Sequence, residues 1–175
     1  MWNDKTKPYL ISIAAGLLGS LGFPLVIPWI SSEPLVAGPL RLIALLLALG
    51  WLSSLARSRS SLKQIALYGW VAGVSHFCVL TYWLIIAMVE FGGLSLVAGG
   101  LVLLLLAAYC GLYWAAIPAF AAFLRRRLGG FDILCFTAAT LLVEELKSVM
   151  ISGFPWGNFG YGPATTTGWA QWASV

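Results

Sequence analysis

The sequence predicts an all-α integral membrane protein, a bundle of about five transmembrane helices, on three observations. The chain is 61% hydrophobic and only 9% charged, and its mean hydropathy is +0.93. The second observation is a series of long apolar stretches, and the third is the uneven placement of the basic residues. A soluble domain of 175 residues needs a charged surface that so few ionisable side chains do not supply. Lipid is therefore the expected solvent for most of the chain.

Five apolar stretches follow one another, and each has about the 20 residues with which a helix crosses the hydrocarbon core. They cover residues of about 9–30, 35–55, 65–89, 94–124 and 131–151. The first ends near Phe23 or continues through Pro24 and Pro28 to Ile30, and the fourth is long enough to tilt or to end in an interfacial turn near Pro118. In lipid these stretches must be helices, because open strands would leave backbone amides unpaired. Residues 1–175 are therefore expected to form a single polytopic membrane domain.

The basic residues predict the orientation of this bundle. If each stretch crosses the membrane once, eight of the ten basic residues fall in segments on the same side of the membrane, and Arg41 and Lys147 lie at or near the other side. The eight are Lys5, Lys7, Arg57, Arg59, Lys63, Arg125, Arg126 and Arg127. By the positive-inside rule the N-terminus is predicted to be cytoplasmic. The first apolar stretch is not expected to be a cleaved signal peptide, because no Ala-x-Ala site follows it. The same placement explains the basic pI without nucleic acid as a partner.

Cysteine and histidine offer no catalytic or metal-binding pattern. Cys78, Cys110 and Cys135 are widely spaced in apolar stretches, so they predict neither a metal site nor a disulfide framework, and we expect them to pack in the core. His76 precedes Cys78 by two residues, and such residues point apart on a helix. We expect His76 to make an interhelical hydrogen bond.

The stretch SGFPWGNFGYGP (152–163) opens a predicted extracytoplasmic, interfacial loop over residues 152–168, before a further span begins at 169–175. It holds four aromatic residues among four glycines and two prolines. Glycine and proline at this density cannot continue a helix, whereas amphipathic rings favour the interface between lipid and water. Two interpretations remain open: a belt that anchors the bundle, or the wall of a site that contacts lipid.

Just before this loop, Glu144, Glu145 and Lys147 lie inside an apolar stretch. Glu144 and Lys147 are three residues apart on a helix and can form an ion pair, and Lys147 can extend its amine outward to water. Thr137, Thr140, Glu144 and Ser148 share one helical face, which we expect to look into the bundle or a wet cavity. The pair is either a structural ion pair or a contact for a lipid headgroup, since charges within a membrane are functional candidates.

These residues resemble apolipoprotein N-acyltransferases. The pattern Glu144-x-Leu146-Lys147 before SGFPWGNFGY is similar to the family's Glu-x-Leu-Arg and Thr-Gly-Phe-Pro-Trp-x-x-x-Gly-Tyr. Upstream, TYWLIIAMVEFGG (81–93) resembles a Tyr-Trp that precedes a Phe-Gly-Gly turn, and LLLAAYCGLYWA (104–115) resembles the family's Leu-Ala-Ala-Tyr helix. The chain departs from the pattern at Lys147, where Arg is usual, and at Glu145 and Gly157, where apolar residues are usual.

The resemblance implies a multi-pass protein of the bacterial cytoplasmic (inner) membrane. The family transfers an acyl chain from a phospholipid to the N-terminal diacylglyceryl cysteine of a lipoprotein, through a thioester on a catalytic cysteine and without a cofactor. Its Glu/Lys/Cys catalytic residues, as in nitrilases, are expected downstream of Val175. The chain is thus expected to be C-terminally truncated relative to the family and inactive alone, with no catalytic or metal-binding residues of its own.

The resemblance also gives the chain a role, which is to bind lipid substrates and present them at the outer interface. The residues expected to do so are Phe154, Pro155, Trp156, Tyr161, Glu144 and Lys147. Two alternatives remain: a non-enzymatic membrane scaffold or binding protein, and a small transporter. The transporter is less favoured, because the sequence lacks paired broken helices at matching positions.

Overall fold

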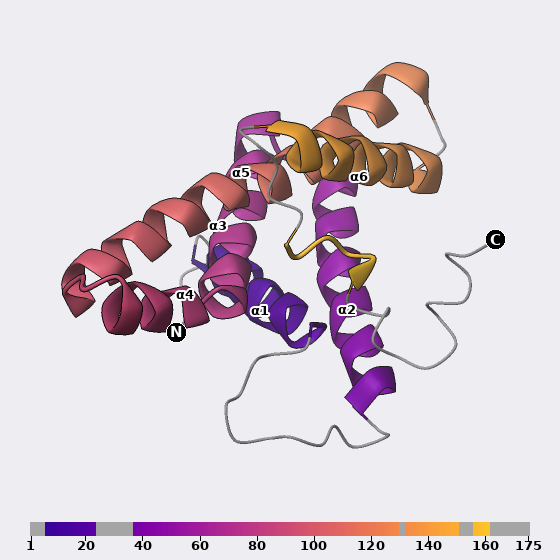
Figure 1. Cartoon of the computed structure of the whole chain (residues 1–175). Helices are drawn as coiled ribbons and strands as arrows, with labels where there is room; N and C mark the ends of the chain where they lie inside the picture. Colours follow the sequence, from indigo (N-terminus) through magenta and orange to yellow (C-terminus); the bar gives the residue numbers. More distant parts are fainter. Residues whose placement is uncertain (1–5, 24–36, 130–131, 151–155, 162–175) are drawn as a thin grey trace.

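The computed structural model describes residues 6–23, 37–129, 132–150 and 156–161, and its regular elements within these residues are all helices, without strands (Figure 1). The elements are α1 (Lys7–Leu21), α2 (Ala37–Arg57), α3 (Leu62–Leu80), α4 (Trp83–Ile86), the π-helical turn η1 (Ala87–Phe91), α5 (Leu96–Leu128) and α6 (Asp132–Val149). The all-α prediction is confirmed for the described residues.

Helix α3 lies at the centre of the bundle, between α1 and α5. Small residues bring the three backbones close together. A Cβ atom on Gly16 of α1 would lie 2.1 Å from the Ala72 carbonyl oxygen of α3, and one on Gly73 would lie 2.6 Å from the Trp114 Cβ of α5. In lipid, where association depends on close packing, such glycines let helices approach one another.

By length and composition, α2 from Pro39 onward and α5 can cross a membrane, and α3 with the α4–η1 segment makes a third candidate if the bent pair is one span. Helix α1 is apolar but has only 15 residues, and the rest of the first predicted stretch, residues 24–30, lies outside the described residues. Helix α6 has 18 residues, or about 27 Å at 1.5 Å per residue, and carries four charged side chains. Membrane-capable helices are thus present, whereas five crossings stay a prediction.

The third predicted stretch, 65–89, is not one straight helix. α3 ends at Leu80, and the following α4–η1 segment is bent from it by 51°. The buried Thr81 marks the break, where its hydroxyl donates a hydrogen bond to the Phe77 carbonyl at 2.6 Å. Hydroxyl groups that bond back to their own helix, and π-helical turns, both bend helices, and the apolar composition alone did not reveal either.

The fourth predicted stretch, 94–124, also differs. Helix α5 continues to Leu128, and the buried Pro118 lies inside it instead of ending it. Gly69 of α3 leaves room for this proline, because a Cβ there would lie 3.0 Å from the Pro118 Cγ. Proline is tolerated in membrane helices when neighbouring groups compensate for the lost backbone bond. The helix ends where Gly129 adopts a φ of 70°.

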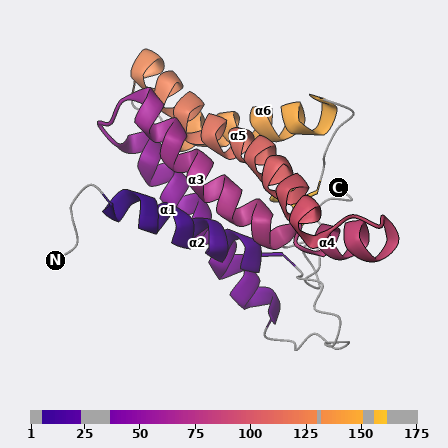
Figure 2. The ribbon, with the colours of Figure 1, turned by 90° about the vertical axis from the view of Figure 1, so that its left-hand side faces the viewer.

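The basic segments meet at one end of the bundle. The Arg125 and Arg126 side chains donate hydrogen bonds to the carbonyls of Arg57 (3.3 Å) and Ser60 (2.7 Å), and Figure 2 shows the end of α5 beside the α2–α3 connection. The Tyr9 and Tyr68 rings, 5.1 Å apart, bring the start of α1 to the same end. The grouping expected from the sequence is therefore present, and its cytoplasmic orientation stays a prediction.

Candidate functional site

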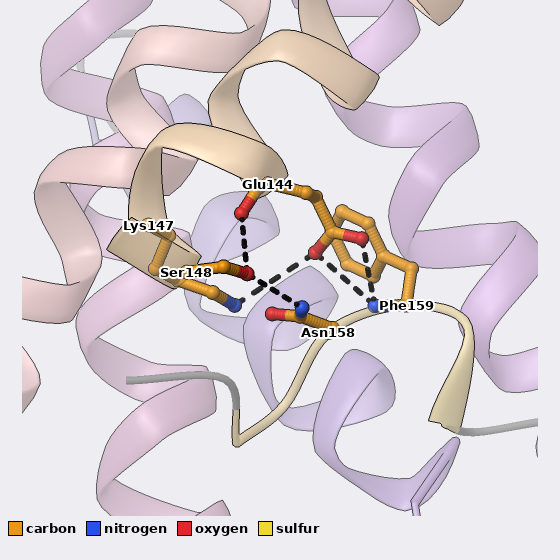
Figure 3. A network of polar contacts seen from close by, with 5 residues as sticks. All are labelled: Glu144, Lys147, Ser148, Asn158 and Phe159. Carbon is orange, nitrogen blue, oxygen red and sulfur yellow. Dashed lines mark hydrogen bonds and ion pairs between the residues drawn. The ribbon is translucent and has the colours of Figure 1, made fainter. Parts of the chain in front are cut away.

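At the opposite end, the C-terminal part of α6 holds the described loop 156–161 against the bundle (Figure 3). Both carboxylate oxygens of Glu144 accept a hydrogen bond from the Phe159 backbone N–H at 3.1 Å. The Glu144 side chain is 20% exposed. A hydrogen bond to a charged group is stronger than one between neutral groups, so this carboxylate acts as a clamp on the loop.

Lys147 completes the clamp from the same helix. Its Nζ lies 3.7 Å from a Glu144 carboxylate oxygen, so the predicted ion pair is confirmed. The Lys147 side chain is only 3% exposed, and its amine lies 5.6 Å from the centre of the Phe77 ring of α3. The expectation that Lys147 extends outward to water is therefore wrong. A carboxylate partner and an aromatic face compensate its charge inside the bundle.

A second polar link joins the loop to α6. The Ser148 hydroxyl donates to the Glu144 carbonyl at 3.0 Å and accepts from the Asn158 side-chain amide at 3.3 Å. The predicted polar face is only partly directed inward, because Thr137 is exposed. The hydroxyl of Thr140 bonds to the Phe136 carbonyl of its own helix, so it needs no partner inside the bundle.

The loop itself is shaped to fit the surface beneath it. Gly157 has a φ of 78°, and a Cβ there would lie 2.6 Å from the Leu80 Cδ2. The next turn closes with a hydrogen bond from the Tyr161 N–H to the Asn158 carbonyl at 2.9 Å. Phe159 is buried against Trp114 of α5, with ring centres 5.5 Å apart. Glycine at 157 is thus favoured by the backbone angle, and a larger residue would also require the Leu80 side chain to shift.

Two of the predicted lipid-contacting residues lie on the exposed side of this loop. Trp156 is 49% exposed and packs against Trp83 of α4, with ring centres 4.8 Å apart, and Tyr161 is 54% exposed. Phe154 and Pro155, predicted for the same site, lie outside the described residues. The loop therefore buries one ring and presents two others at the surface.

His76 lies beneath the loop, fully buried and stacked on Trp114 with ring centres 4.4 Å apart. Neither ring nitrogen makes a hydrogen bond of good geometry within the described part of the chain, but the backbone of Gly16 in α1 lies close enough to interact with the ring, so the expected interhelical polar contact is present in a weak form. Gly157 of the loop lies near the ring, since a Cβ placed on it would be 3.7 Å from Nε2, but glycine has no side chain that could bond to this nitrogen. The rest of the surroundings of the ring are aromatic, with Phe23, Phe77 and Trp114 as neighbours.

The structure places the three cysteines inside or partly inside the bundle. Cys110 and Cys135 are buried, Cys78 is half-buried, and none forms a disulfide. Lys147 lies close enough to Cys110 to interact with it electrostatically, a proximity that sequence spacing did not indicate. The described residues also contain no cluster of three or more metal-ligating side chains.

Sequence reasoning found Glu144 and Lys147 but missed their partners. The groups that complete the site are the Phe159 backbone N–H, the Phe77 ring and the Asn158 amide. A backbone donor leaves no trace in a sequence pattern, and Phe77 lies 70 residues from Lys147 along the chain. The polar spacing of Ser148 with Glu144 was the one signal that pointed toward this network.

The fold and the site together define a helical membrane domain that holds an aromatic loop at one end with a buried ion pair. Residues 15–175 match the family model of the apolipoprotein N-acyltransferase N-terminal domain. The chain belongs to the apolipoprotein N-acyltransferase family, which confirms the resemblance found in its sequence motifs.

Relatives from several bacteria support this assignment. The chain is 30% identical over 154 residues to the apolipoprotein N-acyltransferase of Haemophilus ducreyi, covering 87% of the chain and 26% of that protein. It is 31% identical over 158 residues to the enzyme of Haemophilus influenzae, covering 90% and 27%. For the Geobacter metallireducens enzyme the identity is 30% over 162 residues, covering 89% and 27%. The chain thus spans about a quarter of the length of these relatives.

Proposed function

We propose that this chain is the membrane part of an enzyme that transfers an acyl chain from a phospholipid to the N-terminal diacylglyceryl cysteine of bacterial lipoproteins. In this proposal the protein is a multi-pass protein of the bacterial inner membrane. The family assignment and the membrane-capable helices support it. The domain binds lipid substrates and presents them, whereas residues 1–175 alone carry out no transfer, because two of the three cysteines are buried and the third is half-buried, and burial in apolar surroundings disfavours a thiolate.

The observation that carries this proposal is that one side of the loop is held against the bundle while its other side exposes aromatic rings. Glu144 and Lys147 fix the loop from inside, Phe159 inserts beneath it, and Trp156 and Tyr161 remain exposed. A rigid loop that presents amphipathic rings is suited to contact an acyl chain and its ester group together. Glu144 and Lys147 thus act on lipid through the loop.

Phe154 and Pro155 belong to the same proposed surface by their position in the sequence. They immediately precede Trp156, whose ring packs on Trp83 at the end of the bundle that is remote from the basic segments. In this proposal the loop forms one wall of the route by which acyl chains reach the reacting groups. No cofactor or nucleic acid takes part.

Replacing Trp156 by alanine in the full-length gene product tests this function. We expect normal membrane levels but about a tenfold or greater loss in the rate of acyl-enzyme formation from phospholipid, since a tenfold change needs only about 1.4 kcal/mol of lost positioning. The assay is thioester formation with a phospholipid donor, followed by transfer to a lipoprotein acceptor.

The matched control is Phe91→Ala, which removes another exposed ring (89%), at the end of η1. A simple membrane anchor predicts similar, small effects for both variants. Normal thioester formation and transfer by the Trp156→Ala protein would leave Trp156 as an aromatic anchor. A full-length protein that forms no thioester at all would favour the membrane scaffold.

A further inference from the structure

The end of the bundle opposite the aromatic loop gathers basic side chains from four helices. Asp132 is the one acidic side chain that the described residues place there. Apart from Arg125, which is about one third exposed, the basic side chains at this end are exposed. They are Lys7, Arg57, Arg59, Lys63, Arg125, Arg126 and Arg127. Such an excess of positive charge is electrostatically complementary to an anionic partner.

Part of this cluster is held in a fixed shape. The hydrogen bonds from Arg125 to the Arg57 carbonyl and from Arg126 to the Ser60 carbonyl fasten the α2–α3 connection to the end of α5. At the start of α3, Ser61 accepts from the Gln64 N–H while the Gln64 side chain accepts from the Ser61 N–H, which fixes the other end of this connection. A phosphate would therefore meet donors that are already ordered.

Two donors at this junction are left without a hydrogen bond. The Ser58 hydroxyl and the Arg125 Nε are both buried atoms, and neither has a hydrogen-bond partner in the described chain. Arg125 Nε has Asp132 Oδ1 at 3.9 Å, an ion pair but not a hydrogen bond. Buried donors are nearly always satisfied in folded proteins, so these two point to an acceptor that the described residues do not provide.

The position of the basic cluster indicates which kind of molecule supplies the missing hydrogen-bond acceptor. Arg57 is the last residue of α2, and the three arginines of α5 lie in its last turn, so the charges sit at the ends of the two long membrane-capable helices. Phe123 and Leu128 are exposed apolar residues around these arginines. In a membrane, donors at the ends of spanning helices are expected to lie at the depth of lipid headgroups, where basic pockets between helices bind anionic lipids.

We propose that the junction of the α2–α3 connection with the end of α5 binds the phosphate of an anionic phospholipid, with Ser58, Arg59 and Arg125 around it. The phosphodiester accepts hydrogen bonds from the Ser58 hydroxyl and the Arg125 Nε, and Arg59 supplies further positive charge. The site lies at the other end of the bundle from the aromatic loop, so it does not depend on the proposed acyl transfer.

Native mass spectrometry of the protein, released from micelles with equal amounts of phosphatidylglycerol and phosphatidylcholine, tests the site. We expect the wild type to retain phosphatidylglycerol preferentially. Ser58→Ala keeps the charge but removes one donor to a charged group, and should reduce this preference by about tenfold. Arg59→Gln should reduce it by about fivefold, the factor for about 1 kcal/mol per basic residue. Arg57→Gln serves as a second charge variant if Arg59→Gln lowers the thermal midpoint.

The matched control is Arg41→Gln, which removes the same charge near Gly22, at the other end of the bundle. It should leave the preference unchanged. Equal losses for Arg41→Gln and Arg59→Gln would mean that net charge alone attracts the lipid, and would overturn the proposal, as would an unchanged preference in Ser58→Ala. Displacement of the lipid by millimolar glycerol 3-phosphate would assign the junction to a soluble phosphate compound instead.

Discussion

Lys147 is the residue whose surroundings differ most from those expected. A lysine near a helix end can reach water by extending its long side chain, yet this one lies beneath the aromatic loop with Glu144 and Phe77 as its partners. Removing one member of a buried ion pair leaves the other charge uncompensated, which costs far more than the loss of an exposed pair. Lys147 and Glu144 should therefore behave as a unit.

Glu144→Gln tests this at the residue scale. The amide oxygen of the glutamine can still accept from the Phe159 N–H, but Lys147 loses its counter-charge. We therefore expect the free energy of unfolding to fall by up to about 3–5 kcal/mol, the cost typical of breaking a buried pair. Thermal unfolding in detergent, followed by tryptophan fluorescence, measures it. The neighbouring Glu145→Gln is the matched control and should be nearly neutral, because Glu145 is exposed.

The double variant Glu144→Gln/Lys147→Met separates the ion pair from the hydrogen bond. It leaves no unpaired charge, so its stability should return most of the way to that of the wild type, giving a strong coupling in the double-mutant cycle. Additive effects of the two substitutions, or wild-type stability for Glu144→Gln alone, would show that the buried pair is not an energetic unit.

At the scale of the elements, the contact of α1, α3 and α5 depends on positions where no side chain fits. Gly73 of α3 faces Gly111 and Trp114 of α5 so closely that a Cβ would lie 2.8 Å from the Gly111 Cα. By contrast, Gly50 of α2 and Gly100 of α5 have nothing within 4 Å of the place where a Cβ would be. The glycines of one helical bundle therefore have two different roles.

Gly73→Ala and Gly100→Ala form a matched pair that tests this difference. Overpacking at the α3–α5 contact should cost about 1–3 kcal/mol. At Gly100 alanine meets open space and is the better helix former by about 1 kcal/mol, so the effect should be neutral or stabilising. The thermal midpoints in detergent give the comparison, and equal midpoints for the two variants would contradict the close α3–α5 packing.

For the whole molecule, the two chemically different ends predict a fixed orientation in the membrane. Basic segments gather at one end, and the aromatic loop lies at the other. Because positive residues favour the cytoplasmic side, we expect positions 57–63 and 125–127 to be cytoplasmic, and positions 91–93 and 157–162 to be external.

Cysteine-accessibility labelling measures this orientation, in a background where the three native cysteines are replaced. Cysteines at Ser60 and Arg127 should react with a membrane-impermeant reagent only after the membrane is opened, and cysteines at Phe91 and Gly160 should react in intact cells. All four residues are partly or fully exposed in the structure. Labelling of position 127 from outside would reverse the orientation.

The sequence by itself determined the fold class, the approximate helices and the family. Composition requires a helical membrane protein, because apolar stretches of this length have no other way to satisfy their backbone in lipid. The motif around Glu144 and Lys147 and the following Gly-Phe-Pro-Trp identified the family, and the helical spacing predicted the ion pair. These are local properties, set by residues that are neighbours along the chain or on one helix face.

Only the tertiary structure decided where that pair points and what it holds. The burial of Lys147 depends on the Phe77 ring of another helix, and the clamp depends on the Phe159 backbone N–H, which no side-chain pattern records. The bend after α3 likewise depends on Thr81, and the continuation of α5 past Pro118 depends on the space at Gly69. Hydropathy reports how well each residue tolerates lipid, whereas these features arise from contacts between residues that are distant in sequence.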